Sequence, residues 1–148
     1  MISIGGNIAV TGSAPERKGF WRVGIKNPFS PDEVACYIDC TDKIISVSGD
    51  YERYFIKDNK LYHHIFDPST GYPVDNDIKS VVVIAKDGLV SDALSTALFV
   101  MGKEKAVNFY NSGVYDFETV IFTYDNKVYV SDGIKNNVKF LTSSFEII

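Results

Sequence analysis

The arrangement of short apolar segments along the first 85 residues is the feature that most constrains the fold of this chain. Apolar residues there alternate with polar ones or form brief runs, and Gly, Pro, Asn or Asp residues separate the segments. This pattern is typical of strands joined by turns. We expect a turn or a short helical start at residues 30–32 and a hairpin turn at Lys57, Asp58 and Asn59. The expected strands lie at residues 2–10, 20–25, 34–40, 44–47, 51–56, 60–66 and 79–85.

The second half of the chain contains the helical patterns. Residues 91–101 carry an apolar stripe at helical spacing, and Gly102 follows where a helix often ends. Residues 103–110 form a second expected helix, and residues 119–124 and 127–131 form a final hairpin. Many strands, two helices and this hairpin predict an α+β fold with mostly antiparallel strands.

Length, charge and cysteine content exclude several classes of protein. A chain of 148 residues suits one domain that can bury a core. The formal net charge is -4, so the chain lacks the basic surface that nucleic acid or an anionic membrane would require. No apolar run reaches the length of a membrane span. Cys36 and Cys40 match no zinc or disulfide spacing and would lie roughly 13 Å apart on a strand, so we interpret them as buried apolar residues.

Asp92 and Thr96 lie on the expected helix SDALSTALFVMG at positions i and i+4, and therefore on one helix face. A carboxylate and a hydroxyl are hard oxygen ligands that suit Mg²⁺. A helix N-terminus also favours a nearby anion such as a phosphate. The alternative is that Asp92 complements the helix dipole as a first-turn acid and that Thr96 has no role. Spacing alone leaves both interpretations open.

His63 and His64 are the two histidines of the chain, and they precede an Asp-Pro-Ser-Thr-Gly turn in HHIFDPSTGYPV. Neighbouring strand residues point to opposite faces, so the two imidazoles cannot both face one site. An imidazole can accept the proton of a hydroxyl nucleophile. The alternative is a hydrogen-bonded structural histidine, and these residues alone do not decide between the two.

Two glycine-containing turns lie beside polar residues. Gly5 and Gly6 precede Asn7 in SIGGNIAV, and Ser48 and Gly49 precede the aromatic part of SVSGDYERYF. Turns without side chains let a backbone approach a phosphate or a flat ring. Glycine turns also occur where nothing binds, so each turn alone is a weak indication of a site.

Five ordered stretches of the chain together resemble the ApbE family, the flavin transferases that move FMN from FAD onto a threonine of a target protein. The resemblance runs from about the first residue to Gly102, and the final hairpin is compatible with it. It implies an ApbE-like half-domain over residues 1–148. The matching stretches are ISIGGNIAVTG, FWRVGIKNP, SVSGDYERYF, HHIFDPSTGYPV and VSDALSTALFVMG.

The resemblance implies a role for each candidate residue. Asp92 and Thr96 are similar to the side-chain ligands of a catalytic Mg²⁺. His64 is similar to the motif histidine of the family, a base for the acceptor threonine, which leaves His63 as a structural residue. The implied reaction is attack of the acceptor hydroxyl on the FMN phosphorus of FAD, with release of AMP. The residues that resemble parts of the wall around FAD are Gly5, Gly6, Asn7, Ser48 and Gly49.

The chain resembles only the C-terminal portion of the catalytic domain. Family members carry a further segment before the glycine turn, which holds much of the FAD site and a backbone ligand to the metal. The chain would then be a cloned fragment, a shortened gene product or one piece of a split enzyme. Strand edges and apolar faces would be exposed, so we expect self-association and little or no transferase activity alone. The resemblance also implies a location outside the cytoplasm, associated with a membrane.

Three functions remain as hypotheses. The first is a flavin transferase half that is active when completed, and the second is a flavin- or nucleotide-binding module without catalysis. The third is a domain that binds a protein partner. FAD binding separates the third hypothesis from the others, and Mg²⁺-dependent AMP release separates the first from the second.

Overall fold

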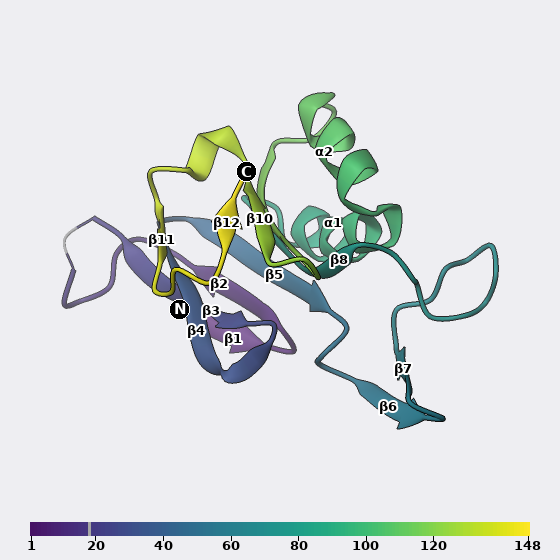
Figure 1. Ribbon diagram of the computed structural model, residues 1–148. Helices are drawn as coiled ribbons and strands as arrows, with labels where there is room; N and C mark the ends of the chain where they lie inside the picture. The colour runs from purple at the N-terminus through teal and green to yellow at the C-terminus, as the bar shows by residue number, and fades with distance from the viewer. Residues whose placement is uncertain (18) are drawn as a thin grey trace.

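A seven-stranded sheet lies at the centre of the fold, between a three-stranded sheet and two helices (Figure 1). The computed structural model describes residues 1–17 and 19–148. The strand order of the large sheet is β1-β2-β5-β8-β9-β10-β12, and its neighbours are antiparallel except for β10 and β12. Its strands are β1 (Ile2–Ile4), β2 (Asn7–Val10), β5 (Lys43–Gly49), β8 (Ile78–Ala85), β9 (Phe117–Thr123), β10 (Lys127–Val130) and β12 (Glu146–Ile147).

The remaining elements lie on the two faces of this sheet or project from its end. The order of the three-stranded sheet is β11-β4-β3, and a separate hairpin pairs β6 with β7. This architecture confirms the α+β prediction of two helices with mostly antiparallel strands. The elements are β3 (Trp21–Asn27), β4 (Ser30–Cys40), β6 (Tyr54–Lys57), β7 (Lys60–His63), β11 (Val138–Phe140), α1 (Gly88–Met101), α2 (Lys103–Asn111) and the short 3-10 helix η1 (Asp132–Ile134).

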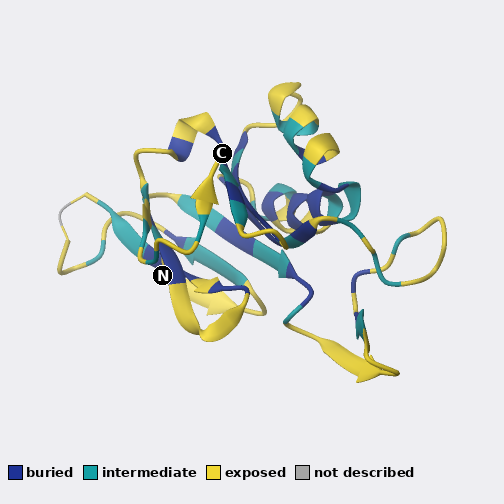
Figure 2. Cartoon of the chain, viewed as in Figure 1, coloured by how far each residue is buried: buried dark blue, intermediate teal, exposed yellow. Residues whose placement is uncertain are grey.

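Two hydrophobic cores cover the two faces of the central sheet. Because side chains alternate across a strand, β8 contributes to both cores. Val82 and Ile84 pack towards the three-stranded sheet, whereas Val81 and Val83 pack towards the helices. Burial on both faces explains why residues 81–85 of β8 form an unbroken apolar run in the sequence. Figure 2 shows the buried residues concentrated in these layers.

Helix α1 begins at Gly88, three residues before the start that the apolar stripe predicts. Asp87 caps it, since its Oδ1 accepts hydrogen bonds from the backbone N–H groups of Leu89 at 2.8 Å and Val90 at 3.2 Å. Asp87 and Gly88 resemble a turn in the sequence, which concealed the cap. Asp92 therefore lies beyond the first turn, and the prediction that it is a first-turn acid is wrong. The helix ends before Gly102, as predicted.

Residues 30–32 are extended, which corrects the expectation of a turn or a helical start there. They open β4, and the turn falls two residues earlier, between the paired residues Asn27 and Ser30. Asn27 stabilises this turn, because its Oδ1 accepts the N–H of Phe29 at 3.0 Å. Proline tolerates the extended conformation at the open end of a strand, so Pro31 does not prevent β4 from starting at Ser30.

Cys36 is buried and Cys40 is half-buried, and both are free thiols. Burial raises the pKa of Cys36 to about 12 and that of Cys40 to about 11. Both side chains pack in or against the core beneath the three-stranded sheet, as apolar residues would. The interpretation of the two cysteines as apolar packing residues is confirmed for Cys36 and holds in part for Cys40.

The hairpin of β6 and β7 has the turn that the sequence predicts. Asp58 and Asn59 both adopt positive φ angles, 50° and 59°, which suit a tight two-residue turn. The hairpin projects from the main body, and all of β6 is exposed (Figures 1 and 2). Neither helix among residues 1–17 and 19–148 combines the length and the apolar character that a membrane crossing requires.

Candidate active site

Asp92 and Thr96 lie on α1 where this helix packs against β5. Asp92 Oδ1 accepts a hydrogen bond of 3.0 Å from the side-chain amide of Asn7. Thr96 Oγ1 lies 3.2 Å from Ser48 Oγ, which also lies 2.9 Å from Ser95 Oγ. The fold therefore joins four candidate residues from three distant segments into one polar cluster. We call Asn7, Ser48, Asp92 and Thr96 the oxygen cluster.

Serines let α1 approach the sheet closely enough to form this cluster. The Oγ of Ser91 donates to the backbone carbonyl of Val83 at 3.1 Å, and the Oγ of Ser95 donates to the carbonyl of Asp92 at 2.9 Å. Both serines are buried. Their small side chains bond their own hydroxyls to nearby carbonyls, so the helix can lie directly over β5 without leaving these two hydroxyls unpaired.

The glycine turn between β1 and β2 positions Asn7. Gly5 and Gly6 have φ angles of 58° and 89°, a conformation that side chains rarely adopt, and they form the two-residue turn that pairs Ile4 with Asn7. A cavity of about 230 Å³ lies beside Gly6, with Val47 among its lining residues. The predicted role of Gly5 and Gly6 in the flavin wall stays a prediction, and their visible effect is to place Asn7 against Asp92.

Gly49 ends β5 next to Ser48 and has no room for a side chain. A Cβ atom there would lie 2.5 Å from the ring of Tyr51. The aromatic ring therefore folds back over the backbone of Gly49. The structure assigns Gly49 this packing role, and its predicted contact with FAD stays a prediction.

The chemistry of the oxygen cluster suits a hard cation. Asp92 provides a carboxylate and Thr96 a hydroxyl on one helix face, which are ligands that Mg²⁺ accepts. Within the part of the chain that the structure describes, no group of three or more His, Cys, Asp or Glu residues could hold a metal. A Mg²⁺ ion held by Asp92 and Thr96 would keep several water ligands, as this ion often does. The residues fit the ion but would bind it weakly alone.

His63 and His64 have opposite environments, as their neighbouring positions predict. His63 is buried, and its Nε2 donates to the carbonyl of Val74 at 3.0 Å. Its Nδ1 accepts the N–H of Ile65 at 3.3 Å, and its ring meets the edge of Phe99 at 5.7 Å between centroids. These contacts make His63 a structural residue of the core.

His64 is exposed at the end of the hairpin. Its backbone N–H donates to the carbonyl of Arg53 at 3.1 Å, and its Nδ1 lies 3.3 Å from the same oxygen. A carbonyl can only accept, so Nδ1 carries the proton and Nε2 is left as a proton acceptor in the neutral ring. The described contacts join His64 to Arg53 and not to Asp92 or Thr96. The structure thus brings the oxygen cluster together and leaves His64 on a separate element.

The Asp-Pro-Ser-Thr-Gly turn after His64 is an ordered loop. Asp67 Oδ1 accepts hydrogen bonds from the side chain and the backbone N–H of Ser69, at 2.7 and 2.8 Å. These bonds lower the pKa of Asp67. An isolated bridge between Phe66 and Pro73 closes the loop. The loop that follows His64 is therefore held in one ordered conformation by its own hydrogen bonds.

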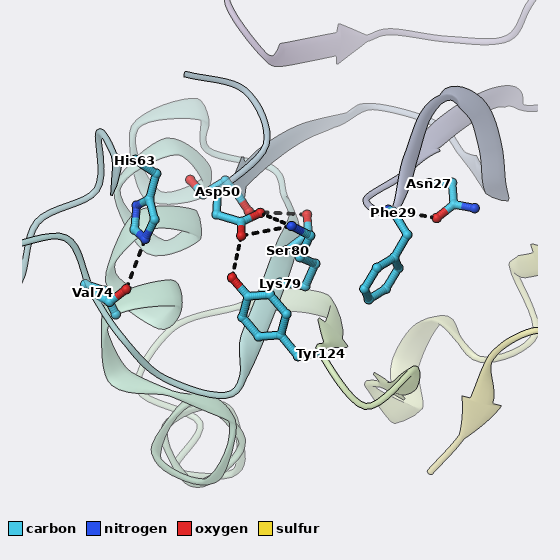
Figure 3. A network of polar contacts seen from close by, with 9 residues as sticks. Asn27, Phe29, Asp50, His63, Val74, Lys79, Ser80 and Tyr124 are labelled. Atoms are coloured by element: carbon cyan, nitrogen blue, oxygen red, sulfur yellow. Dashed lines mark hydrogen bonds and ion pairs between the residues drawn. The ribbon is translucent and has the colours of Figure 1, made fainter. Parts of the chain in front are cut away.

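Asp50 is a buried residue near the site that the sequence analysis missed. Its carboxylate is fully buried and receives Lys79 Nζ, which lies 2.7 Å from Oδ1 and 2.9 Å from Oδ2, with hydrogen-bond geometry only to Oδ2 (Figure 3). The phenol of Tyr124 donates to Oδ2 as well. Burial, and then the bond to Asp50, raises the pKa of Tyr124, so the phenol stays protonated. Lys79, near the start of an otherwise apolar strand, was the sequence feature that could have revealed Asp50. A cation in such a strand needs a partner of opposite charge.

Comparisons with known proteins identify the family of this chain. The model of the ApbE family matches residues 1–121. Proteins named FAD:protein FMN transferase from Klebsiella pneumoniae and Treponema pallidum are 32% and 34% identical over 100% and 98% of this chain. The matches cover 45% and 42% of those relatives, so the chain spans less than half of their length.

Solved structures lead to the same group of proteins. The ApbE protein of Thermotoga maritima superposes with a TM-score of 0.77 at 39% identity, over 90% of this chain and 42% of that protein. The flavin transferase ApbE of Vibrio cholerae superposes with a TM-score of 0.74 at 31% identity, over 93% of this chain and 43% of that protein. The order of the motifs, the α+β architecture and these matches together show that the chain belongs to the ApbE family.

Proposed function

We propose that this chain is the C-terminal portion of a domain that transfers FMN from FAD to a threonine hydroxyl of an acceptor protein. The observation that carries the proposal is the oxygen cluster, in which Asp92 and Thr96 on α1 meet Asn7 and Ser48 from two strands. The names of the relatives support the reaction, and their greater length supports an incomplete domain. A further segment would then complete the FAD site.

The reaction is a displacement at phosphorus. The hydroxyl oxygen of the acceptor threonine forms a bond to the FMN phosphorus, the bond from that phosphorus to the AMP phosphate breaks, and AMP leaves. A Mg²⁺ ion bound by Asp92 and Thr96 would supply positive charge that stabilises the pyrophosphate and the leaving group. Asn7 orients the Asp92 carboxylate, and Ser48 orients the Thr96 hydroxyl.

His64 is the proposed base for the acceptor hydroxyl. Its Nδ1–H is directed at the carbonyl of Arg53, which leaves Nε2 free to accept the hydroxyl proton. Its exposure gives a protein acceptor access to the ring, which the buried His63 does not offer. The hairpin must hold His64 within hydrogen-bond reach of the acceptor hydroxyl when both substrates are bound.

FAD titration with and without Mg²⁺ tests the proposal, with flavin fluorescence as the readout and AMP release as the second measurement. We compare the wild type with Asp92→Ala, and use Asp132→Ala as the control because the Asp132 side chain is 86% exposed in η1. We expect saturable, Mg²⁺-dependent binding in the protein that contains this chain. Asp92→Ala should weaken it by about 100-fold, since it removes a metal ligand, and Asp132→Ala should leave it unchanged.

The outcomes separate the alternative functions. Binding with AMP release and a flavin-labelled threonine supports the transferase. Binding without AMP release supports a flavin- or nucleotide-binding module instead. Absence of FAD binding in the complete protein contradicts both and favours a domain that binds a protein partner.

A further inference from the structure

A six-residue segment connects the two parts of the candidate site. Residue 48 begins it, and the Ser48 hydroxyl contacts Ser95 and Thr96 on α1. Residue 53 ends it, and the Arg53 carbonyl accepts the backbone N–H of His64. The conformation of residues 48–53 therefore contributes to the position of His64 relative to the oxygen cluster, together with the core contacts of His63 and Ile65 on either side of it.

Asp50 lies near the middle of this segment and holds it to the central sheet. Lys79 belongs to β8, and Tyr124 directly follows β9, so both partners of the Asp50 carboxylate come from neighbouring strands of the sheet. The ammonium group of Lys79 also lies 5.2 Å from the ring centroid of Tyr124 and 5.8 Å from that of Phe29. Figure 3 shows the Lys79 and Tyr124 side chains meeting at the Asp50 carboxylate. The two bonds to Oδ2 restrain the position of this carboxylate.

The contribution of this ion pair to stability does not explain why the fold contains it. A buried pair loses its hydration, and apolar residues of similar volume often give equal or greater stability. A directional pair instead specifies one geometry, which an apolar contact does not. Asp50 lies between Ser48 and Arg53, so a fixed geometry of the ion pair would restrain the segment that joins these two residues. The ring of Tyr51, which packs over Gly49, restricts the same segment from the adjacent position.

We propose that Asp50, held by Lys79 and Tyr124, is a positioning residue that fixes His64 relative to Asp92 and Thr96. The inference rests on the proposed function for its catalytic consequence. FAD and the metal meet the oxygen cluster, whereas His64 takes part in the chemical step. Loosening the segment at Asp50 should therefore lower kcat by a larger factor than it raises the KM for FAD.

The test replaces the ion pair by an apolar pair in the complete protein that contains this chain, as Asp50→Leu with Lys79→Met. The matched control is Asp39→Leu with Arg22→Met, which removes a partly buried ion pair of 2.6 Å in the three-stranded sheet, away from the site. Three quantities are measured: the unfolding midpoint, the kcat and KM of FMN transfer, and hydrogen exchange of residues 60–66 compared with β9.

We expect the apolar pair to unfold near the wild-type midpoint and to lose about 10- to 100-fold in kcat, as small displacements of catalytic groups do. Exchange at residues 60–66 should accelerate, and exchange in β9 should not. The control pair should keep the wild-type kcat. A folded apolar pair with wild-type kcat and wild-type exchange at residues 60–66 would overturn the proposal.

A gentler variant and an activity-independent readout keep the test decisive. If the apolar pair does not fold, Tyr124→Phe removes only the hydroxyl contact and should give the same pattern with a smaller loss. If the wild type transfers no FMN, the proposed function fails, and hydrogen exchange decides the positioning role alone. Unchanged exchange at residues 60–66 in both variants would then refute it.

Discussion

The helix α1 and the hairpin of β6 and β7 hold the two parts of the candidate site in different ways. Helix α1 packs on β5 and β8, and Leu98 and Phe99 on its inner face have at most 1% of their surface exposed. The hairpin is a separate two-stranded sheet, and Ile56 at its outer strand is 67% exposed. Asp92 and Thr96 thus lie on a helix that packs on the core, whereas His64 directly follows the hairpin and is exposed between the buried residues His63 and Ile65.

This difference matches the two tasks that the proposed reaction sets. Metal ligands act when their oxygens are held at fixed separations, which a packed helix provides. A base that serves a protein acceptor must be reachable from solvent and must allow the product to leave. Four experiments test this contrast between the packed helix α1 and the exposed hairpin of β6 and β7.

The largest expected effect separates the two histidines. His64→Asn in the complete protein should lower the rate of FMN transfer by about 100- to 10,000-fold, because it removes the proposed base. FAD affinity and the unfolding midpoint should not change, since the side chain is exposed. His63→Asn should do the opposite and lower the unfolding midpoint, because it disrupts the bond to Val74 and the contact with Phe99. Rate assays and thermal melts of both variants check this, and a normal rate for His64→Asn would refute the assignment.

The second experiment compares equivalent truncations in the two regions. Leu98→Ala should reduce the free energy of unfolding by about 2–5 kcal/mol, because Leu98 is fully buried on the inner face of α1. Ile56→Ala on the hairpin should change it by less than about 0.5 kcal/mol. Urea unfolding measures both. Equal losses would mean that the hairpin packs against something in solution, such as a second copy of the chain.

The third experiment acts on the segment between the two regions. Gly49→Ala should cost about 1–3 kcal/mol of stability, because the new methyl group would overlap the Tyr51 ring. Gly24→Ala in β3 is the matched control, since its nearest neighbours lie at 3.5 Å, an ordinary contact distance. Chemical denaturation distinguishes them. A tolerated alanine at residue 49 would show that the segment adapts easily.

The smallest effect concerns the hairpin alone. Phe55 and Tyr62 stack with centroids 5.1 Å apart and planes 6° from parallel. Phe55→Ala should remove about 0.5–1.5 kcal/mol of local stability and accelerate hydrogen exchange within the hairpin. The global unfolding midpoint should stay the same. A lower global midpoint would show that the hairpin unfolds together with the core.

The sequence was sufficient where one local rule decided the structure. A local strand, turn or helix preference accounts for the apolar run at residues 81–85 of β8, the positive φ angles at Asp58 and Asn59, and the glycine after α1. It failed where a competing signal was stronger. Asp87 looked like a turn residue and is a helix cap, and residues 30–32 looked like a turn and begin β4. The short strands β11 and β12 lacked any pattern, because pairing with other strands alone defines them.

The candidate site divides in the same way. Sequence spacing placed Asp92 and Thr96 on one face of a helix, since helical periodicity is a local property. It also separated the environments of His63 and His64, because adjacent strand residues point apart.

Only the tertiary structure decided what these residues meet. Asn7 reaches Asp92 across 85 positions of sequence, and Asp50 meets Lys79 and Tyr124 from two other strands. Such contacts depend on the strand order and on how closely the helix packs on the sheet. Neither property can be recognised from the local periodicity of the sequence. The sequence by itself determined which side chains could do chemistry, and the packing of α1 on the sheet determined which of them lie together.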